Sequence, residues 1–221
     1  MHDRFNQLAY QKYENANRHI LEYIVRSGVV NPAVLDVGCW MGAFGEHLKR
    51  YKECQVDGIE INREVSEVAL KRGYRHIYPI DLNNSDFSEI DQKYDFIVCG
   101  DVLEHMIDPG SVITHLKSKL AETGFFAVSL PNVGFVLYRL LHLIGCWEYK
   151  EYGVMDKTHL RFFTLNSMKR FFNLHNLRIM RMDSNMGLNR SAFVVRIATA
   201  AANICPSLLA VQIVFLLKAG E

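Results

Sequence analysis

The sequence has almost no excess of charge of either sign. Its 221 residues carry 25 Lys and Arg against 24 Asp and Glu, a formal net charge of +1. Proteins that bind DNA or an anionic membrane through charge usually show a basic excess. Hydrophobic residues make up 49% of the chain and charged residues 22%, the composition of an ordinary globular protein. The overall charge therefore indicates neither DNA nor a membrane as a partner.

Paired cysteines are also missing. The five cysteines form no C-x-x-C pair and so show no metal or redox spacing: Cys39, Cys54, Cys99, Cys146 and Cys205. An odd number at scattered positions is typical of reduced thiols in the cytosol. The first residues, Met1 to Asn6, are polar and lack the apolar core of a signal peptide. We expect a cytoplasmic protein with five free thiols.

No internal repeat or low-complexity linker divides the chain, and its length suits one domain over residues 1–221. Helical patterns occur at residues 11–25, 63–72 and 111–121. Runs typical of strands occur at residues 33–37, 55–61, 75–78, 96–100, 125–130, 177–183 and 211–217. Strands that alternate with helices in the first half predict an α/β fold with a parallel sheet.

The most informative segment follows the first predicted strand. Asp36 stands two residues before Gly38, and Gly42 and Gly45 complete a glycine-rich turn that leads into a helix. This spacing differs from the G-x-G-x-x-G of dinucleotide-binding turns. A carboxylate beside the turn would gain nothing from an anionic pyrophosphate, whereas a cationic ligand would be attracted to it. The charge pattern favours a cationic cofactor such as S-adenosylmethionine (SAM).

The segment resembles motif I of the class I SAM-dependent methyltransferases, hydrophobic-x-D-x-G-C-G-x-G. The resemblance implies a Rossmann-like, seven-stranded, mostly parallel sheet with a reversed last strand, helices on both faces and a small cap insert at residues 133–165. It also implies that Asp36, Gly38, Cys39 and Gly42 hold SAM. Trp40 replaces the family's middle glycine, which normally lets the backbone approach the methionine moiety.

Two further segments match the cofactor contacts of that family. Glu60, with Ile61 beside it, ends the second predicted strand about twenty residues after the glycine-rich turn, where a carboxylate can accept from both ribose hydroxyls. Asp81 and Leu82 resemble the adenine site, in which an Asp accepts from the exocyclic amine and an apolar neighbour covers the ring. For Asp81, a helix cap or turn role is the alternative.

The fourth predicted strand ends in an acid-x-x-Glu-His pattern, which resembles the ubiquinone-biosynthesis group of methyltransferases. Asp101, Glu104 and His105 have i, i+3 and i+4 spacing, which places them on one face of a helical turn. Three hypotheses remain open: a Mg²⁺ or Zn²⁺ site, metal-free proton transfer by His105, and a structural role. Asp101 is also a candidate cofactor contact.

Residues 156–164 read Asp-Lys-Thr-His-Leu-Arg-Phe-Phe-Thr and resemble a signature of a broad methyltransferase group, whose histidine is placed near the methyl group. This makes His159 a candidate catalytic residue. In small-RNA 2'-O-methyltransferases a distal His joins an acid-x-x-Glu-His cluster around Mg²⁺, so Asp101, Glu104, His105 and His159 form a candidate metal set. Thr164 also looks like a helix cap.

The rest of the chain is less specific. Residues 135–147 are mostly apolar, as in a substrate cover, a buried helix or a membrane-surface helix. Residues 191–217 hold one full charge, Arg196, yet Pro206 disfavours a membrane span, and we expect a helix followed by a strand. Residues 156–181 carry a local charge of +5, which we interpret as a solvated helix face rather than a site for an anionic acceptor.

Together these features predict a SAM-dependent methyltransferase that methylates oxygen on a small molecule, a glycan or a lipid-linked intermediate. We expect His105 and His159 to remove a proton or to orient the acceptor, without a metal. The alternatives are an RNA 2'-O-methyltransferase with a divalent metal, and a non-catalytic SAM-fold binding protein. Neither DNA nor RNA is expected as a partner, a membrane surface stays open, and the oligomeric state cannot be read from the sequence.

Overall fold

A computed structural model of the protein describes residues 17–84, 87–186, 200 and 202–220. The described part of the first predicted helix is α2 (Arg18–Val25). The side chain of Asn17 accepts hydrogen bonds from the backbone N–H groups of His19 and Ile20, and so caps this helix. The helix ends before Gly28, which adopts a positive φ of 77°.

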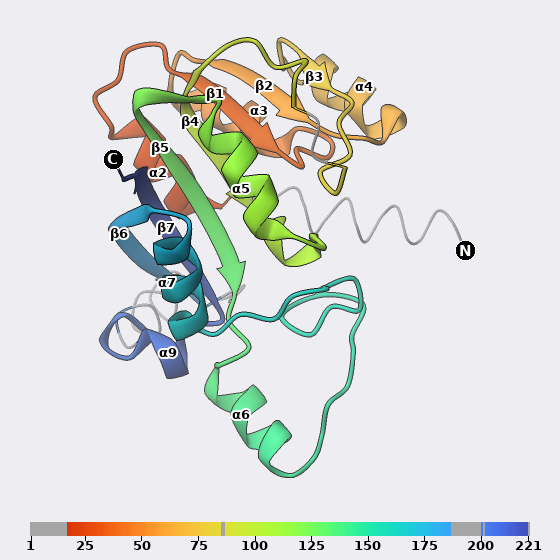
Figure 1. The fold of residues 1–221 in the computed structure, drawn as a ribbon, viewed down its shortest axis with the longest axis vertical. Helices are drawn as coiled ribbons and strands as arrows, with labels where there is room; N and C mark the ends of the chain where they lie inside the picture. The colour runs from red at the N-terminus through yellow and green to blue at the C-terminus, as the bar shows by residue number, and fades with distance from the viewer. Residues whose placement is uncertain (1–16, 85–86, 187–199, 201, 221) are drawn as a thin grey trace. The chain divides into compact units, whose positions relative to one another are not determined.

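Seven strands form one sheet in the order β3-β2-β1-β4-β5-β7-β6 (Figure 1). Pairs β1–β2, β1–β4 and β2–β3 are parallel, and β6–β7 is antiparallel. The mixed sheet with a reversed last strand confirms the predicted fold class. The strands are β1 (Ala33–Val37), β2 (Gln55–Ile59), β3 (Ile77–Tyr78), β4 (Tyr94–Gly100), β5 (Leu120–Pro131), β6 (Leu177–Asn185) and β7 (Gln212–Ala219).

Two compact units make up the chain, and unit 1 comprises residues 1–100 and 115–127. It contains α3 (Ala43–Tyr51), which contacts α2, and α4 (Arg63–Lys71), which contacts β3. Asp36 of β1 is in register with Gly58 of β2 and with Val98 of β4. The carboxyl ends of these parallel strands therefore meet at one edge, where ligands bind in open α/β sheets.

Unit 2 comprises residues 101–114 and 128–221. Its helix α7 (Leu165–Leu174) packs on β6 and buries Leu165, Met168 and Phe172 (Figure 1). The predicted cap at Thr164 is confirmed, because its side chain accepts from the backbone N–H of Ser167 in a capping box. The predicted helix at 111–121 is α5 (Pro109–Lys117), which lies partly in each unit.

The apolar segment after β5 forms α6 (Val136–Leu143), which buries none of its residues. Leu140 is 57% exposed, and Leu143 is 81% exposed. A buried core helix is therefore excluded for this segment. Within the described residues, no helix is long and apolar enough to span a membrane. The helix expected before β7 falls largely on residues 187–199 and 201, which lie outside the described part, and α9 (Pro206–Leu209) follows it.

Candidate functional site

The glycine-rich turn of unit 1 is built from three left-handed residues between β1 and α3. Gly38, Trp40 and Gly42 have φ values of 68°, 49° and 79°. The N–H groups of Gly38 and Cys39 donate to the carbonyl of Ile59, at 2.9 and 3.1 Å. Glycine adopts such a conformation freely, whereas a tryptophan carries a steric cost on the order of 1 kcal/mol. Trp40 therefore keeps the backbone conformation that a glycine would adopt readily.

Glu60 holds the turn at its strained residue. Its Oε2 accepts a hydrogen bond from the backbone N–H of Trp40 at 3.2 Å, and its Oε1 accepts from Asn62 N–H at 2.8 Å. Glu60 is only half-buried. Its neighbour Ile61 is 61% exposed. The structure thus places the predicted ribose acid next to the predicted methionine-binding turn.

Asp36 is buried beneath the same turn, with 5% of its surface exposed. Its Oδ2 accepts a hydrogen bond from the Tyr74 hydroxyl at 2.5 Å. Burial raises the pKa of Asp36 to about 7, the Tyr74 hydrogen bond opposes this rise, and the charge of Glu60 adds to it. A cation at this site would favour the ionised carboxylate.

Asp81 forms a local turn after β3. Its Oδ1 accepts from the backbone N–H of Asn83 at 2.9 Å, and its Oδ2 accepts from the Asn84 side chain at 3.2 Å. The flanking Ile80 and Leu82 are buried. The turn role considered for Asp81 is therefore present in the structure, and the adenine role of Asp81 and Leu82 stays a prediction.

In unit 2, Asp101 lies outside the helical turn on which the sequence placed it. The turn is a 3-10 helix, η1 (Leu103–His105), and Asp101 precedes it with a positive φ of 53°. Its carboxylate accepts from the Ser129 hydroxyl at 3.0 Å and from Gln212 Nε2 at 2.7 Å. The expectation that Asp101 shares one face of a helical turn with Glu104 and His105 was wrong, because Asp101 precedes the turn in a left-handed conformation.

Three of the four predicted residues do come together. The ligand atoms of Glu104, His105 and His159 lie within 4.8 Å of one another, and among the described residues Asp101 is not part of this group. His159 Nε2 is 3.9 Å from Glu104 Oε1, and the two histidine rings are 4.8 Å apart. Glu104 is 1% exposed and His159 is 8% exposed. We call these three residues the Glu-His-His cluster.

Both histidines of the cluster have the same hydrogen-bonding pattern. His105 Nδ1 lies 3.1 Å from the Thr158 carbonyl, and His159 Nδ1 lies 3.1 Å from the Val154 carbonyl. A carbonyl only accepts, so each Nδ1 carries the hydrogen, and a neutral ring then has its lone pair on Nε2. The Thr158 hydroxyl donates to Asp156 Oδ1 at 2.7 Å and is therefore oriented to accept from His105 as well.

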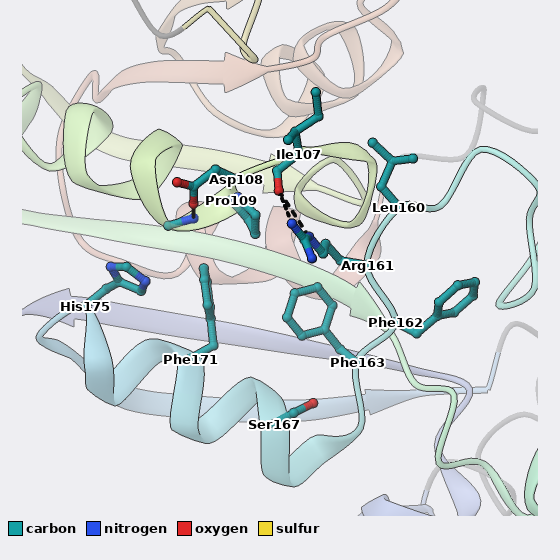
Figure 2. A pocket seen from close by; sticks show the side chains of 11 residues that line it. Ile107, Asp108, Pro109, Leu160, Arg161, Phe162, Phe163, Ser167, Phe171 and His175 are labelled. Carbon is teal, nitrogen blue, oxygen red and sulfur yellow. Dashed lines mark hydrogen bonds between the residues drawn. The ribbon is translucent and has the colours of Figure 1, made fainter.

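The signature at residues 156–164 ties this cluster together. The backbone N–H groups of Leu160 and Arg161 donate to the carbonyl of Glu104 at 2.8 and 3.0 Å. The Arg161 guanidinium donates to the Ile107 carbonyl, through Nε at 3.1 Å (Figure 2). These contacts join segments more than fifty residues apart in the sequence, so the signature holds His159 beside Glu104 and His105.

A pocket of about 480 Å³ lies beside these contacts, between the start of α5 and α7 (Figure 2). Its volume is within the range of ligand-binding pockets. Aromatic side chains form one wall, and Arg161 and Asp108 supply charges. The lining residues are Ile107, Asp108, Pro109, Gly110, Leu160, Arg161, Phe162, Phe163, Ser167, Phe171 and His175.

Ring contacts lead from the cluster to α6. His159 contacts Phe162 at a centroid distance of 6.1 Å, and Phe162 contacts Trp147 at 5.4 Å. Trp147 stacks on His142 of α6 at 4.3 Å. The apolar segment that the sequence suggested as a substrate cover is thus connected to the cluster through aromatic side chains.

The basic residues of the 156–181 segment are partly neutralised by neighbouring acids. Lys157 Nζ lies 2.7 Å from Glu151 Oε2, and Arg181 Nε lies 2.8 Å from Asp183 Oδ2. These pairs fit the interpretation of a solvated surface.

Sequence reasoning missed two site residues, Tyr74 and Gln212. Only Gln212 gave a signal, as a polar residue at the start of an apolar run.

Comparison with known proteins gives one family match: the family described as methyltransferase domain matches residues 7–181. A ubiquinone biosynthesis O-methyltransferase of Actinobacillus pleuropneumoniae serotype 5b is 32% identical over 149 residues, which cover 63% of this chain and 62% of that protein. One of Yersinia enterocolitica is 35% identical over 118 residues, which cover 51% and 48%. The chain thus matches less than two thirds of the length of both relatives.

Solved structures show the same fold at low sequence identity. A putative methyltransferase in complex with the Trm112 methyltransferase activator of Haloferax volcanii has a TM-score of 0.67 at 14% identity, covering 99% of this chain and 95% of that chain. The plantazolicin methyltransferase BamL was solved with a triazolic desmethylPZN analogue and S-adenosylhomocysteine (SAH). It has a TM-score of 0.60 at 15% identity, and the match covers 90% of this chain and 82% of that chain.

Proposed function

From the premise that this chain belongs to the methyltransferase-domain family and is a SAM-dependent methyltransferase, we propose that it methylates a hydroxyl oxygen of a small-molecule acceptor. The names of the curated relatives support oxygen as the nucleophile. The acceptor class extends to glycans and lipid-linked intermediates. Each of these offers a hydroxyl group, and each requires help in losing its proton.

Unit 1 would hold the cofactor. Asp36, which is buried, would attract the cationic part of SAM, the left-handed turn from Gly38 to Gly42 would allow a close backbone approach, and Glu60 beside the turn would accept from the ribose hydroxyls. The proposed contacts of unit 1 are completed by Cys39, Ile61, Asp81 and Leu82. The fit is supported by the buried carboxylate of Asp36, because a carboxylate whose pKa is raised by burial gains most from a cationic ligand.

The observation that carries the proposal is the shared tautomer of His105 and His159. Each ring donates its Nδ1 hydrogen to a backbone carbonyl and has its lone pair on Nε2. One Nε2 accepts the proton of the acceptor hydroxyl as the oxygen attacks the methyl carbon. Bound SAM would supply the methyl group: the O–CH₃ bond would form as the S–CH₃ bond breaks, and the electron pair would stay on sulfur in SAH. Buried Glu104, 3.9 Å from His159, stabilises the imidazolium that results.

A divalent cation is the second candidate for this cluster. One carboxylate and two imidazoles suit Mg²⁺ or Zn²⁺, and histidine ligands commonly donate Nδ1–H to a backbone carbonyl, as both do here. Glu104, His105 and His159 would hold the ion, which would supply Lewis-acid polarisation of the acceptor hydroxyl. The RNA 2'-O-methyltransferase alternative rests on a four-ligand set, and the hydrogen bonds of Asp101 to Ser129 and Gln212 weigh against it.

Aromatic and apolar surroundings support an acceptor with an apolar portion. Phe162 lies between His159 and Trp147, and it also lines the pocket beside Arg161. Exposed leucines of α6 continue this surface. We assign the segment 133–165 to acceptor binding, with a membrane surface as a further partner for a lipid-linked acceptor. Phe162→Ala should raise the KM for the acceptor several-fold and leave SAM affinity unchanged.

The experiment is an acceptor panel with SAM and the full chain, with SAH release as the readout. The panel holds a catechol, a hexose, a polyprenylated phenol and, as a competing nucleophile, a primary amine. Product analysis by mass spectrometry locates the methyl group. Methylation at oxygen supports the proposal. Methylation at nitrogen overturns it, and SAM binding without SAH from any compound favours the non-catalytic alternative.

A further inference from the structure

We propose that Tyr74 is a positioning residue of the cofactor site, whose hydroxyl joins the start of α3 to Asp36 and keeps Asp36 able to receive SAM. The inference rests on the proposed role of Asp36 in SAM binding. It adds a residue outside the motifs that the sequence suggested, in the segment between α4 and β3.

The first step of the argument is the hydrogen-bond chain through the Tyr74 hydroxyl. Gly45 N–H donates to Tyr74 Oη at 2.9 Å, and Tyr74 Oη donates to Asp36 Oδ2 at 2.5 Å. Gly45 lies in the first turn of α3, whose cap residue Gly42 has no side chain to accept from the helix. The first N–H groups of a helix need an external acceptor. Tyr74 supplies that acceptor from another segment of unit 1.

The second step concerns the two glycines that surround Tyr74. A methyl group on Gly42 would lie 2.7 Å from Tyr74 Cε2, and one on Gly45 would lie 2.5 Å from the same atom. Both distances are far inside van der Waals contact. The Tyr74 ring therefore leaves no room for a side chain at Gly45, and at Gly42 the ring and Ala69 together exclude one, apart from any contact with the cofactor. Tyr74 itself is 4% exposed, so its ring is packed inside the protein.

The third step is electrostatic. The groups that face Asp36 are Tyr74, Glu60 and Cys39. Burial raises the pKa of the Tyr74 hydroxyl and of the Cys39 thiol, so both are neutral at pH 6–8. The Tyr74 hydrogen bond is the contact that lowers the pKa of Asp36. Without this hydrogen bond the pKa of Asp36 would be higher. The side chain would then stay protonated up to a higher pH and would not attract the sulfonium and ammonium of SAM there.

The test is isothermal titration of the full-length chain with SAM between pH 5.5 and 9. The affinity of the parent for SAM should rise with pH as Asp36 ionises, and we call this rise the acid limb of the profile. The affinity should fall near pH 8 as the SAM ammonium deprotonates, since free α-amino groups titrate there, and we call this fall the alkaline limb. Tyr74→Phe keeps the ring and removes the hydroxyl. It should move the acid limb upward by about one pH unit or more, because a hydrogen bond to a carboxylate is lost.

Two further variants make the result specific. Tyr94→Phe is the matched control, because the buried Tyr94 hydroxyl donates to the buried carboxylate of Asp57 at 2.8 Å, away from the turn. It should leave the acid limb in place. Asp36→Asn should remove the acid limb and keep the alkaline one. If Tyr74→Phe fails to fold, Gly45→Ala tests the same contact, because its methyl group must displace the Tyr74 ring.

An unshifted acid limb in Tyr74→Phe overturns the inference, as does an equal shift in Tyr94→Phe. If Asp36→Asn keeps the acid limb of the parent, another group titrates and the inference also fails. These binding results do not depend on methyl transfer, so a failure of the proposed acceptor chemistry would be recognised separately.

Discussion

Gln212 Nε2 donates to both carboxylate oxygens of Asp101, at 2.7 Å to Oδ1 and 2.5 Å to Oδ2. Asp101 is the left-handed residue that follows β4, and Gln212 is the first residue of β7. Their side-chain pair, which lies within unit 2, holds the Asp101 carboxylate outside the Glu-His-His cluster.

Replacing Gln212 by Ala should therefore destabilise the protein. The variant loses a partly buried hydrogen bond to a charged group, which typically contributes about 1.5–3 kcal/mol to the free energy of unfolding. Urea unfolding followed by circular dichroism measures the difference. Gln212→Glu places a second carboxylate against Asp101. Its loss of unfolding free energy should therefore be larger at pH 8 than at pH 5. Equal stability of the parent and both variants would show that the pair has no structural role.

Asp36 and Glu60 should each contribute to SAM affinity. Asp36→Ala removes a carboxylate that faces the cationic cofactor, and Glu60→Ala removes the ribose acceptor and the hydrogen bond to Trp40 N–H. Each change should weaken SAM binding by about 1.5–3 kcal/mol, measured by isothermal titration at pH 7.5. Asp81→Ala should also weaken SAM binding, because Asp81 is the proposed acceptor for the exocyclic amine of adenine. If Asp36→Ala and Glu60→Ala both bind SAM like the parent, the cofactor assignment is wrong.

The raised pKa of Asp36 predicts how stability depends on pH. Its pKa rises from 3.8 to about 7 on folding, so the native state holds one more proton than the unfolded state between these values. The contribution of Asp36 to stability therefore decreases as pH rises from about 4 to 7, by an amount on the order of 3 kcal/mol. Comparing chemical unfolding of the parent and Asp36→Asn across this range isolates the effect. The stability difference between them should change with pH, and a constant difference would contradict the burial argument.

The strand pattern was predictable because it depends on local sequence. Each of the seven predicted runs overlaps a strand, and β1 has the predicted bounds. The capping role of Thr164 was also local, as it depends on a neighbour three residues away. The position of Glu60 at the glycine-rich turn could be predicted because its spacing from the glycines is constrained by the β-α-β connection, and the cofactor roles of Asp36 and Glu60 stay predictions.

What the sequence could not predict depends on contacts between distant segments. The position of Asp101 is decided by Gln212, 111 residues later. The tautomers of His105 and His159 depend on the carbonyls of Thr158 and Val154, to which no side-chain pattern points. All five cysteines are free in the structure, and their expected titration as five thiols remains to be measured.

The central claim is that His105 and His159 act as proton acceptors without a metal. The most direct measurement is the rate of SAH formation with the acceptor found by the panel, for the parent with and without EDTA and for His105→Ala and His159→Ala. We predict that EDTA changes the rate little, and that at least one histidine variant lowers kcat by about a hundredfold or more with nearly unchanged SAM affinity. Loss of turnover in EDTA that Mg²⁺ or Zn²⁺ restores would contradict the account and assign the cluster to a metal.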